Sequence, residues 1–180
     1  MAYPDYSLEY RLIEASQLGN LERIEELLKA GANVHVENDT PLVEASWRGH
    51  VAAVELLLEA GADIHAKNDW ALYVASLHGR DKVVEVLLKA GANVHAENDM
   101  ALLRVSEQGR TKVVKLLLEA GADVHAMNDA ALQLAYLNKR TNVFKILVDW
   151  GADTSKIIDE YKEMREYISV NPRCVGGVIF

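Results

Sequence analysis

The sequence predicts an all-α fold in which short helices stack as a repeat solenoid, and three observations lead to this fold class. A Gly-Ala dipeptide recurs every 30 residues, and an Asn-Asp dipeptide recurs with the same spacing. Between these markers the apolar residues follow a helical period twice in each unit. Self-similarity at a fixed period of roughly 20–50 residues is typical of repeat architectures. The dipeptides begin at Gly31, Gly61, Gly91, Gly121 and Gly151, and at Asn38, Asn68, Asn98 and Asn128.

Each unit is expected to contain two helices joined by a tight turn. In the unit that starts at Asp69, apolar and small residues recur at i, i+3, i+4 spacing on both sides of Gly79. Glycine suits this turn because it adopts left-handed backbone without strain, and Gly91 is placed to end the second helix. Neither helix can bury its apolar face alone, so the units are expected to stack side by side. The two faces consist of Leu72, Ala75 and Ser76, and of Val83, Val84, Leu87 and Leu88.

The Asn-Asp dipeptides place an aspartate at the expected start of the first helix of each unit. A carboxylate there accepts hydrogen bonds from the free N–H groups of the first turn. We therefore interpret Asp39, Asp69, Asp99 and Asp129 as helix caps. Acid–base catalysis by paired acids requires environments that separate their pKa values. A ladder of equivalent positions gives every aspartate nearly the same environment, which argues against that role.

No other motif points to catalysis. The sequence has no Gly-rich phosphate loop, no Gly-x-Ser-x-Gly and no zinc-finger spacing. The single cysteine, Cys174, stands in the C-terminal tail with no histidine near it in sequence. We therefore expect a protein that is not an enzyme and has no cofactor.

One unit carries the motifs of a known family in consecutive order. They are Thr40-Pro41-Leu42, Ala45-Ser46, Gly49-His50, Val54, Leu57-Leu58 and Gly61-Ala62-Asp63. This pattern resembles the ankyrin repeat, and the resemblance covers about residues 8–155. It implies helix pairs joined by β-hairpin or loop fingers, with a concave face that binds other proteins. The units here have 30 residues where the family has about 33, so short fingers are expected.

The Asn-Asp-x-Ala-Leu variant of the unit also resembles the short ankyrin repeats of giant DNA viruses of amoebae. That resemblance implies a protein acting in a host cytoplasm on a host partner.

The chain is expected to form a single solenoid over residues 1–180 with modified ends. A helical stripe at Ile157, Tyr161, Met164 and Ile168 indicates a closing helix, whereas Pro172 and Gly176-Gly177 break helix in an apolar tail. The expected segments are an N-terminal capping repeat at 8–37, central repeats at 38–67, 68–97 and 98–127, a degenerate last repeat at 128–155, a C-terminal capping helix at 156–169 and an apolar tail at 170–180.

Composition restricts the class of partner. The net charge is −8, which argues against nucleic acid because affinity for phosphate backbones depends on clustered Lys and Arg. The same charge argues against an anionic membrane surface, and no run approaches the roughly 18 apolar residues of a membrane span. The N-terminus lacks the pattern of a signal peptide. We therefore expect a cytoplasmic protein with a protein partner.

A ladder of histidines, one per finger, raises the question of a metal site. Equivalent positions in stacked helical units lie about 8–10 Å apart, whereas zinc needs all its ligands at about 2.0–2.3 Å. Hydrogen bonding along the fingers is therefore the favoured role. The ankyrin resemblance also implies a target for an asparaginyl hydroxylase at this position, with leucines such as Leu57 upstream. The histidines are His35, His65, His95 and His125.

Arginines follow the turn between the two helices in three repeats, at Arg80, Arg110 and Arg140. The repeat at 38–67 has His50 at this position. They are candidates for a basic stripe that meets an acidic partner. Solvated side chains, or pairs with glutamates on neighbouring helices, are the favoured interpretation, and such surface pairs contribute little stability.

The positions that vary between units are free to specify a partner. Several of them are large and apolar at spacings that place them on one stripe of the first helices. Trp and Tyr dominate binding hot spots, and apolar patches outside a core mark interaction sites. Packing between units remains an alternative role. The candidate patch is Val43, Trp47, Trp70, Tyr73, Leu77 and Leu103, with Arg48, His78 and Gln108 as its polar rim.

The sequence therefore predicts a protein-binding adaptor or inhibitor that uses Trp47, Trp70, Tyr73 and Leu77 as anchors. The alternative is a structural protein that self-associates through an end repeat or the tail. A monomer is expected in the first case and a homo-oligomer in the second.

Overall fold

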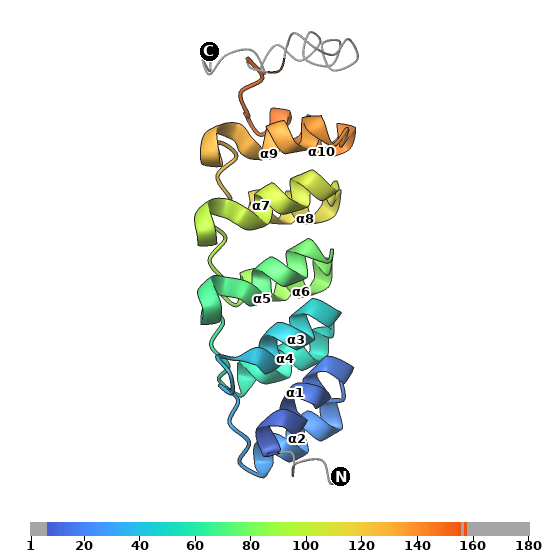
Figure 1. Cartoon of the computed structure of the whole chain (residues 1–180), viewed down its shortest axis with the longest axis vertical. Coiled ribbons are helices and arrows are strands. Elements are labelled where there is room, and N and C mark those ends of the chain that lie inside the picture. Colours follow the sequence, from blue (N-terminus) through green and yellow to red (C-terminus); the bar gives the residue numbers. More distant parts are fainter. Residues whose placement is uncertain (1–6, 156, 158–180) are drawn as a thin grey trace, which may run out of the picture. The chain divides into compact units, whose positions relative to one another are not determined.

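The computed structural model describes residues 7–155 and residue 157, and the regular structure in these residues is α-helical without strands. The helices come in consecutive pairs (Figure 1), which confirms the all-α repeat class. The pairs are α1 Leu8–Leu18 with α2 Leu21–Lys29, α3 Thr40–Arg48 with α4 Val51–Glu59, α5 Ala66–Leu77 with α6 Asp81–Lys89, α7 Ala96–Gln108 with α8 Thr111–Glu119, and α9 Ala126–Leu137 with α10 Thr141–Asp149.

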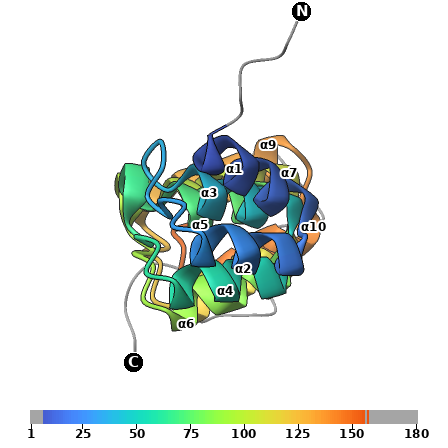
Figure 2. The same cartoon turned by 90° about the horizontal axis from the view of Figure 1, so that it is seen from below.

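The chain divides into two compact units, residues 1–93 and residues 94–180. In the first unit α1, α3 and α5 pack in one layer, and α2, α4 and α6 pack in a second layer (Figure 2). In the second unit α7 packs on α9, and α8 on α10. Each helix therefore contacts its own partner and the equivalent helix of a neighbouring repeat within its unit.

A leucine recurs at the centre of both layers and is almost completely buried in every repeat. The repeated period places these side chains on the inner face of each helix, where stacking removes them from water. Burying one such side chain contributes about 1.5–3 kcal/mol. The fully buried large residues include Leu12, Ile24, Leu27, Leu42, Leu57, Leu72, Leu87, Leu102, Leu117, Leu118, Leu132, Phe144 and Leu147.

The fingers are compact turns, so of the two expected forms, hairpin or loop, the described residues adopt the loop. Each turn contains three consecutive residues with positive φ, such as Glu37 at 50°, Asn38 at 56° and Asp39 at 58°. The left-handed conformation costs about 1–2 kcal/mol per residue, and Asn and Asp tolerate it best. Three left-handed residues reverse the chain within a short segment, which accounts for the short repeat.

The expected C-terminal capping helix and apolar tail lie outside the described residues, apart from Ile157, which is buried. Cys174 also lies outside them. None of the described helices has the length and apolar character needed to cross a bilayer.

Candidate protein-interaction surface

Four aromatic side chains of the first unit form two pairs on the exposed side of α3 and α5. We call Trp47, Trp70, Tyr73 and His78 the aromatic cluster. Trp47 is next to last in α3, and His78 follows the last residue of α5. Trp70 and Tyr73 are one turn apart near the start of α5. The inner faces of both helices hold the buried alanines, serines and leucines, so these larger side chains point away from the core.

Ring contacts fix the cluster in place. The rings of Trp70 and Tyr73 stack with centroids 4.7 Å apart and planes inclined by 29°. The Trp47 ring lies 5.7 Å from the imidazole of His78 in the next repeat, at 55°. The Arg48 guanidinium carbon lies 4.2 Å from the centroid of the Trp47 ring, within the range of a cation–π contact. The side chains are therefore held in position before any partner binds.

The side chains of the predicted patch differ in how far they are exposed to solvent. Trp70 is 43% exposed, and Trp47, Tyr73, Val43 and Leu77 are partly exposed. These five side chains thus provide accessible apolar area on α3 and α5.

Leu103 does not belong to this surface. It lies in the second unit, is only 5% exposed, and is one of the buried residues of α7. We therefore correct its assignment from partner contact to packing residue. Gln108 is exposed, also in the second unit, and its Oε1 accepts a hydrogen bond from Nε of Arg110 at 3.3 Å. Among the predicted residues, the structure joins Trp70 to Tyr73 and Trp47 to His78 and Arg48, all in the first unit.

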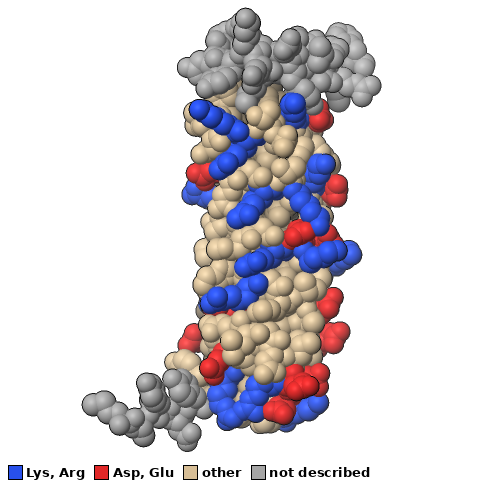
Figure 3. All heavy atoms as spheres, turned by 90° about the vertical axis from the view of Figure 1, so that its right-hand side faces the viewer, with Lys and Arg blue, Asp and Glu red and all other residues tan. Residues whose placement is uncertain are grey.

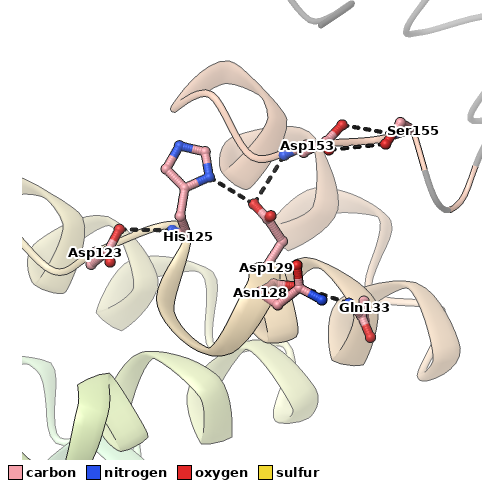
Figure 4. A network of polar contacts seen from close by, with 7 residues as sticks. All are labelled: Asp123, His125, Asn128, Asp129, Gln133, Asp153 and Ser155. Carbon is pink, nitrogen blue, oxygen red and sulfur yellow. Dashed lines mark hydrogen bonds and ion pairs between the residues drawn. The ribbon is translucent and has the colours of Figure 1, made fainter. Parts of the chain in front are cut away.

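The histidine ladder makes the hydrogen bonds expected along the fingers. His35 donates from Nδ1 to Oδ1 of Asp39 at 3.0 Å, and His65 does the same to Asp69 at 3.1 Å. A carboxylate only accepts, so Nδ1 carries the proton in these contacts. Figure 4 shows the equivalent contact of His125 with Asp129 at 2.9 Å. Among the described residues, no group of three or more His, Cys, Asp or Glu side chains is arranged to hold a metal ion.

The aspartate ladder has a different role from the one that the sequence predicts. Asp39 stands at the start of α3, yet its side chain makes no capping hydrogen bond. Its Oδ1 instead accepts the backbone N–H of Asp63 in the next finger at 2.7 Å. Asp69 accepts from Asn93 at 2.7 Å in the same way. The interpretation of these two residues as helix caps is therefore wrong, because the left-handed turn directs the carboxylate toward the following repeat.

The bridge recurs through both units. In the second unit Asp99 accepts from Asp123 N at 2.9 Å, and Asp129 accepts from Asp153 N at 3.0 Å. The side chains of Asp39, Asp69 and Asp99 are only 6% exposed. The signal in the sequence is the constant 24-residue separation of donor and acceptor, which becomes meaningful only once the finger conformation is known.

Three of the four basic residues after the interhelical turns bind main-chain carbonyls of the preceding repeat, whereas Arg110 binds the side chain of Gln108. Arg80 donates from Nε to the carbonyl of Trp47 at 3.0 Å, and Arg140 donates to that of Glu107 at 2.9 Å. His50 donates from Nε2 to the carbonyl of Gln17 at 3.0 Å. Each contact spans 33 residues and joins a repeat to the end of the first helix in the preceding one. Of the two roles expected for the arginines, solvated side chains or pairs with glutamates, the first fits Arg80 and Arg140, which are exposed and whose Nε atoms bind main-chain carbonyls.

Comparison with known proteins agrees with this architecture. The family profile described as ankyrin repeats in three copies matches residues 12–98 and residues 72–157. A search of curated proteins finds no match. The two matched segments together cover most of the sequence. The repeated helix pairs extend over nearly the same residues. The chain therefore belongs to the ankyrin repeat family.

Proposed function

We propose that the chain is a non-catalytic adaptor or inhibitor that holds a protein partner on the aromatic cluster of its first unit. Ankyrin repeats are in general protein–protein interaction modules. The observation that supports this particular surface is the fixed arrangement of two aromatic pairs on the exposed side of α3 and α5.

Physical reasoning favours this surface over the other exposed apolar residues. Trp and Tyr carry much of the binding energy in interfaces because each has a large rigid surface and one polar group. Ring contacts that exist before binding reduce the conformational entropy lost on association. Arg48 and His78 surround Trp47 with charge and hydrogen-bonding groups, as in the polar rim of an interface. The partner expected here presents an apolar side chain that is bordered by acidic or polar groups.

The experiment has two steps. Affinity capture from a eukaryotic lysate with the native chain identifies a candidate partner, and calorimetry with the purified partner then measures Kd. The test variant combines Trp47→Ala, Trp70→Ala and Tyr73→Ala, and circular dichroism checks that it stays helical. Truncation of hot-spot residues costs about 2 kcal/mol or more, so Kd should rise at least about 30-fold.

Trp150→Ala is the matched control, because Trp150 is 47% exposed and lies in the second unit. It removes as much exposed tryptophan as Trp70→Ala does, without touching the cluster. We expect it to leave Kd unchanged. Equal weakening by both variants would assign the loss to general surface hydrophobicity and would contradict the proposal.

Self-association is the competing function, and ultracentrifugation separates the two. A chain that is monomeric at all concentrations agrees with the adaptor. Concentration-dependent oligomers that disappear on deletion of residues 171–180 would favour the structural protein instead. The cytoplasmic location and the viral type of repeat stay predictions.

Hydroxylation of His35, His65, His95 and His125 also stays a prediction. Their side chains are 54–58% exposed, so an enzyme can approach them. Mass spectrometry of the chain purified from eukaryotic cells would show a 16 Da increase on the finger peptides if the modification occurs, about the mass of one oxygen.

A further inference from the structure

A hollow of about 290 Å³ lies between two interhelical turns of the second unit. We call it the basic hollow. The α7–α8 turn contributes Gln108 and Thr111, and the α9–α10 turn contributes Lys139, Arg140, Thr141 and Asn142. Figure 3 shows the side of the molecule on which the paired helices turn, and lysine and arginine side chains cover much of its upper part. Lys139 and Arg140 give the basic hollow a positive charge on a protein whose net charge is −8.

Arg140 is fixed in the wall of this hollow. Its stem crosses Gly109 so closely that a Cβ built on the glycine would lie 2.8 Å from Cδ of Arg140. Its Nε donates to the carbonyl of Glu107 at 2.9 Å. The two terminal nitrogens remain as donors, and a guanidinium held in this way is suited to binding a carboxylate with two hydrogen bonds.

The rest of the lining contains donors and no acid. Lys139 is exposed, and Thr111, Thr141, Asn142 and Gln108 carry hydroxyl or amide groups. No Asp or Glu lines the hollow among the described residues. The side chain of nearby Glu107 is bound to Arg104 at 3.1 Å. The positive charge of Lys139 and Arg140 is therefore not neutralised from within the lining.

The equivalent place in the first unit has a different set of side chains: Arg48, Val51, Gly79, Asp81 and Lys82 stand where the hollow has Gln108, Thr111, Lys139, Thr141 and Asn142. Arg80 makes the same Nε contact with the preceding repeat as Arg140 does. However, α6 begins with Asp81, whereas α8 begins with Thr111 and α10 with Thr141. Asp81 therefore adds a negative charge directly after Arg80 in the first unit. The second unit lacks that carboxylate at both of its turns.

We propose that the basic hollow binds an acidic segment of a protein, with a Glu or Asp carboxylate of that segment seated on Arg140 and Lys139. Such a surface accelerates association and selects an acidic partner. The proposal goes beyond the aromatic cluster, lies on the other unit and does not depend on it.

The test is fluorescence anisotropy of the full chain with a labelled decaglutamate peptide at low salt. The key variant is Thr141→Asp, which reproduces the Arg80-Asp81 arrangement of the first unit and suits a helix start. We expect its Kd to be at least about fivefold higher than that of the native chain. Lys139→Gln should have an effect of similar size. Thr141→Ser keeps the hydroxyl and should bind as the native chain does.

The arginines give a second matched pair. Arg140→Gln and Arg80→Gln each remove one contact to a preceding repeat, so both should lower the melting temperature by a similar amount. Only Arg140→Gln should weaken peptide binding. Equal weakening by both, or native affinity in Thr141→Asp, would overturn the proposal.

Three further probes identify the chemistry of the ligand. Decaglutamine should not bind, and binding of decaglutamate should weaken as salt rises. A phosphoserine peptide of equal charge that binds about tenfold more tightly would replace the carboxylate by a phosphate as the ligand. Tighter binding of a ten-nucleotide oligothymidine or of phosphatidylserine vesicles would overturn the assignment to a protein segment.

Discussion

At the residue scale, one aspartate oxygen in each finger connects three parts of the structure. Oδ1 of Asp69 accepts from the imidazole of its own finger and from the backbone N–H of Asn93 in the next. Asp69 is also the last of three left-handed residues, which are unfavourable for side chains other than glycine. The two hydrogen bonds therefore offset a conformational cost and link neighbouring repeats at the same point.

Replacement of Asp69 should separate these contributions. Asp69→Ala removes both contacts and leaves the Asn93 N–H without its acceptor, so we expect a loss of about 2–4 kcal/mol in the free energy of unfolding. Asp69→Asn should lose only about 1 kcal/mol, because its amide oxygen still accepts and asparagine tolerates left-handed backbone. Urea denaturation measures both. An alanine variant as stable as the asparagine variant would show that the bridge contributes nothing.

A serine recurs on the inner face of the first helix in several repeats, and most of these serines lack the hydrogen bonds that the finger aspartates make. Ser46, Ser76 and Ser106 are fully buried, and their hydroxyls have no hydrogen-bond partner within the described residues. The equivalent Ser16 donates to the carbonyl of Leu12 at 2.7 Å. The small size of serine explains its place between closely packed helices, but nothing in the structure explains why the residue is not alanine.

Ser76→Ala should therefore raise the free energy of unfolding by about 1 kcal/mol, because it removes an unsatisfied buried hydroxyl and alanine favours helix. Ser16→Ala is the control, and it should gain less because it also removes a hydrogen bond. Thermal denaturation of the two variants gives the comparison. A Ser76→Ala variant less stable than the native chain would mean that this hydroxyl does find a partner in solution.

Residue identity alone does not reveal which role a polar side chain takes. Asp39 precedes Thr40-Pro41 in a pattern typical of a helix start, so the sequence favours a cap. The structure uses the same carboxylate to reach a backbone N–H 24 residues away. The difference arises from the left-handed finger, and no local propensity predicts three successive residues in that conformation.

At the element scale, the turn between the two helices of a repeat is shaped by the repeat that follows. Gly49 has φ of 90°, and a Cβ there would lie 2.8 Å from Cδ of Arg80. Gly61, just after the second helix, has φ of 93°, but a Cβ at this position would have no atom within 4 Å. Both positions need left-handed backbone, and only the first also needs the space.

Alanine at these two glycines should thus have unequal effects. Gly61→Ala is expected to cost about 1–2 kcal/mol from backbone strain alone. Gly49→Ala adds steric overlap with a side chain that is held by its hydrogen bond to Trp47, which raises the expected cost to about 2–4 kcal/mol. In a Gly49→Ala/Arg80→Ala double variant, the steric part should disappear. Additive losses in urea denaturation would rule out the predicted overlap.

Helices were predictable at this scale because a 30-residue period repeats the same apolar spacing several times. The leucines assigned to inner faces, such as Leu72 and Leu87, are indeed fully buried. The fingers were less predictable, since residues without an apolar period carry little information about backbone conformation. Their shortness followed from the repeat length, whereas their left-handed turns did not.

At the scale of the whole molecule, sequence reasoning located the candidate surface only in part. Helical spacing alone places Trp47, Tyr73 and Leu77 on the outer stripe, and the structure gives all three some exposure. The same reasoning placed Leu103 there, although it is buried. Spacing within one helix cannot show what the neighbouring helix covers.

Repeat stacking also determines how a local defect spreads through the chain. Stability in a repeat protein is approximately a sum over repeats and their nearest-neighbour contacts. Phe144 is a fully buried residue of α10, and its ring lies 6.4 Å from that of Tyr136 in α9. Phe144→Ala should remove about 3–5 kcal/mol, and most of that loss should fall on the second unit.

Hydrogen exchange read by mass spectrometry gives the test. In Phe144→Ala, amides of α8, α9 and α10 should exchange faster than in the native chain, whereas amides of α1–α4 in the first unit should keep their protection. Phe144→Leu, which retains most of the apolar volume, should show a smaller change in the same helices. Because nearest-neighbour stacking confines the defect, uniform acceleration over all helices would instead mean that the chain unfolds as one cooperative body.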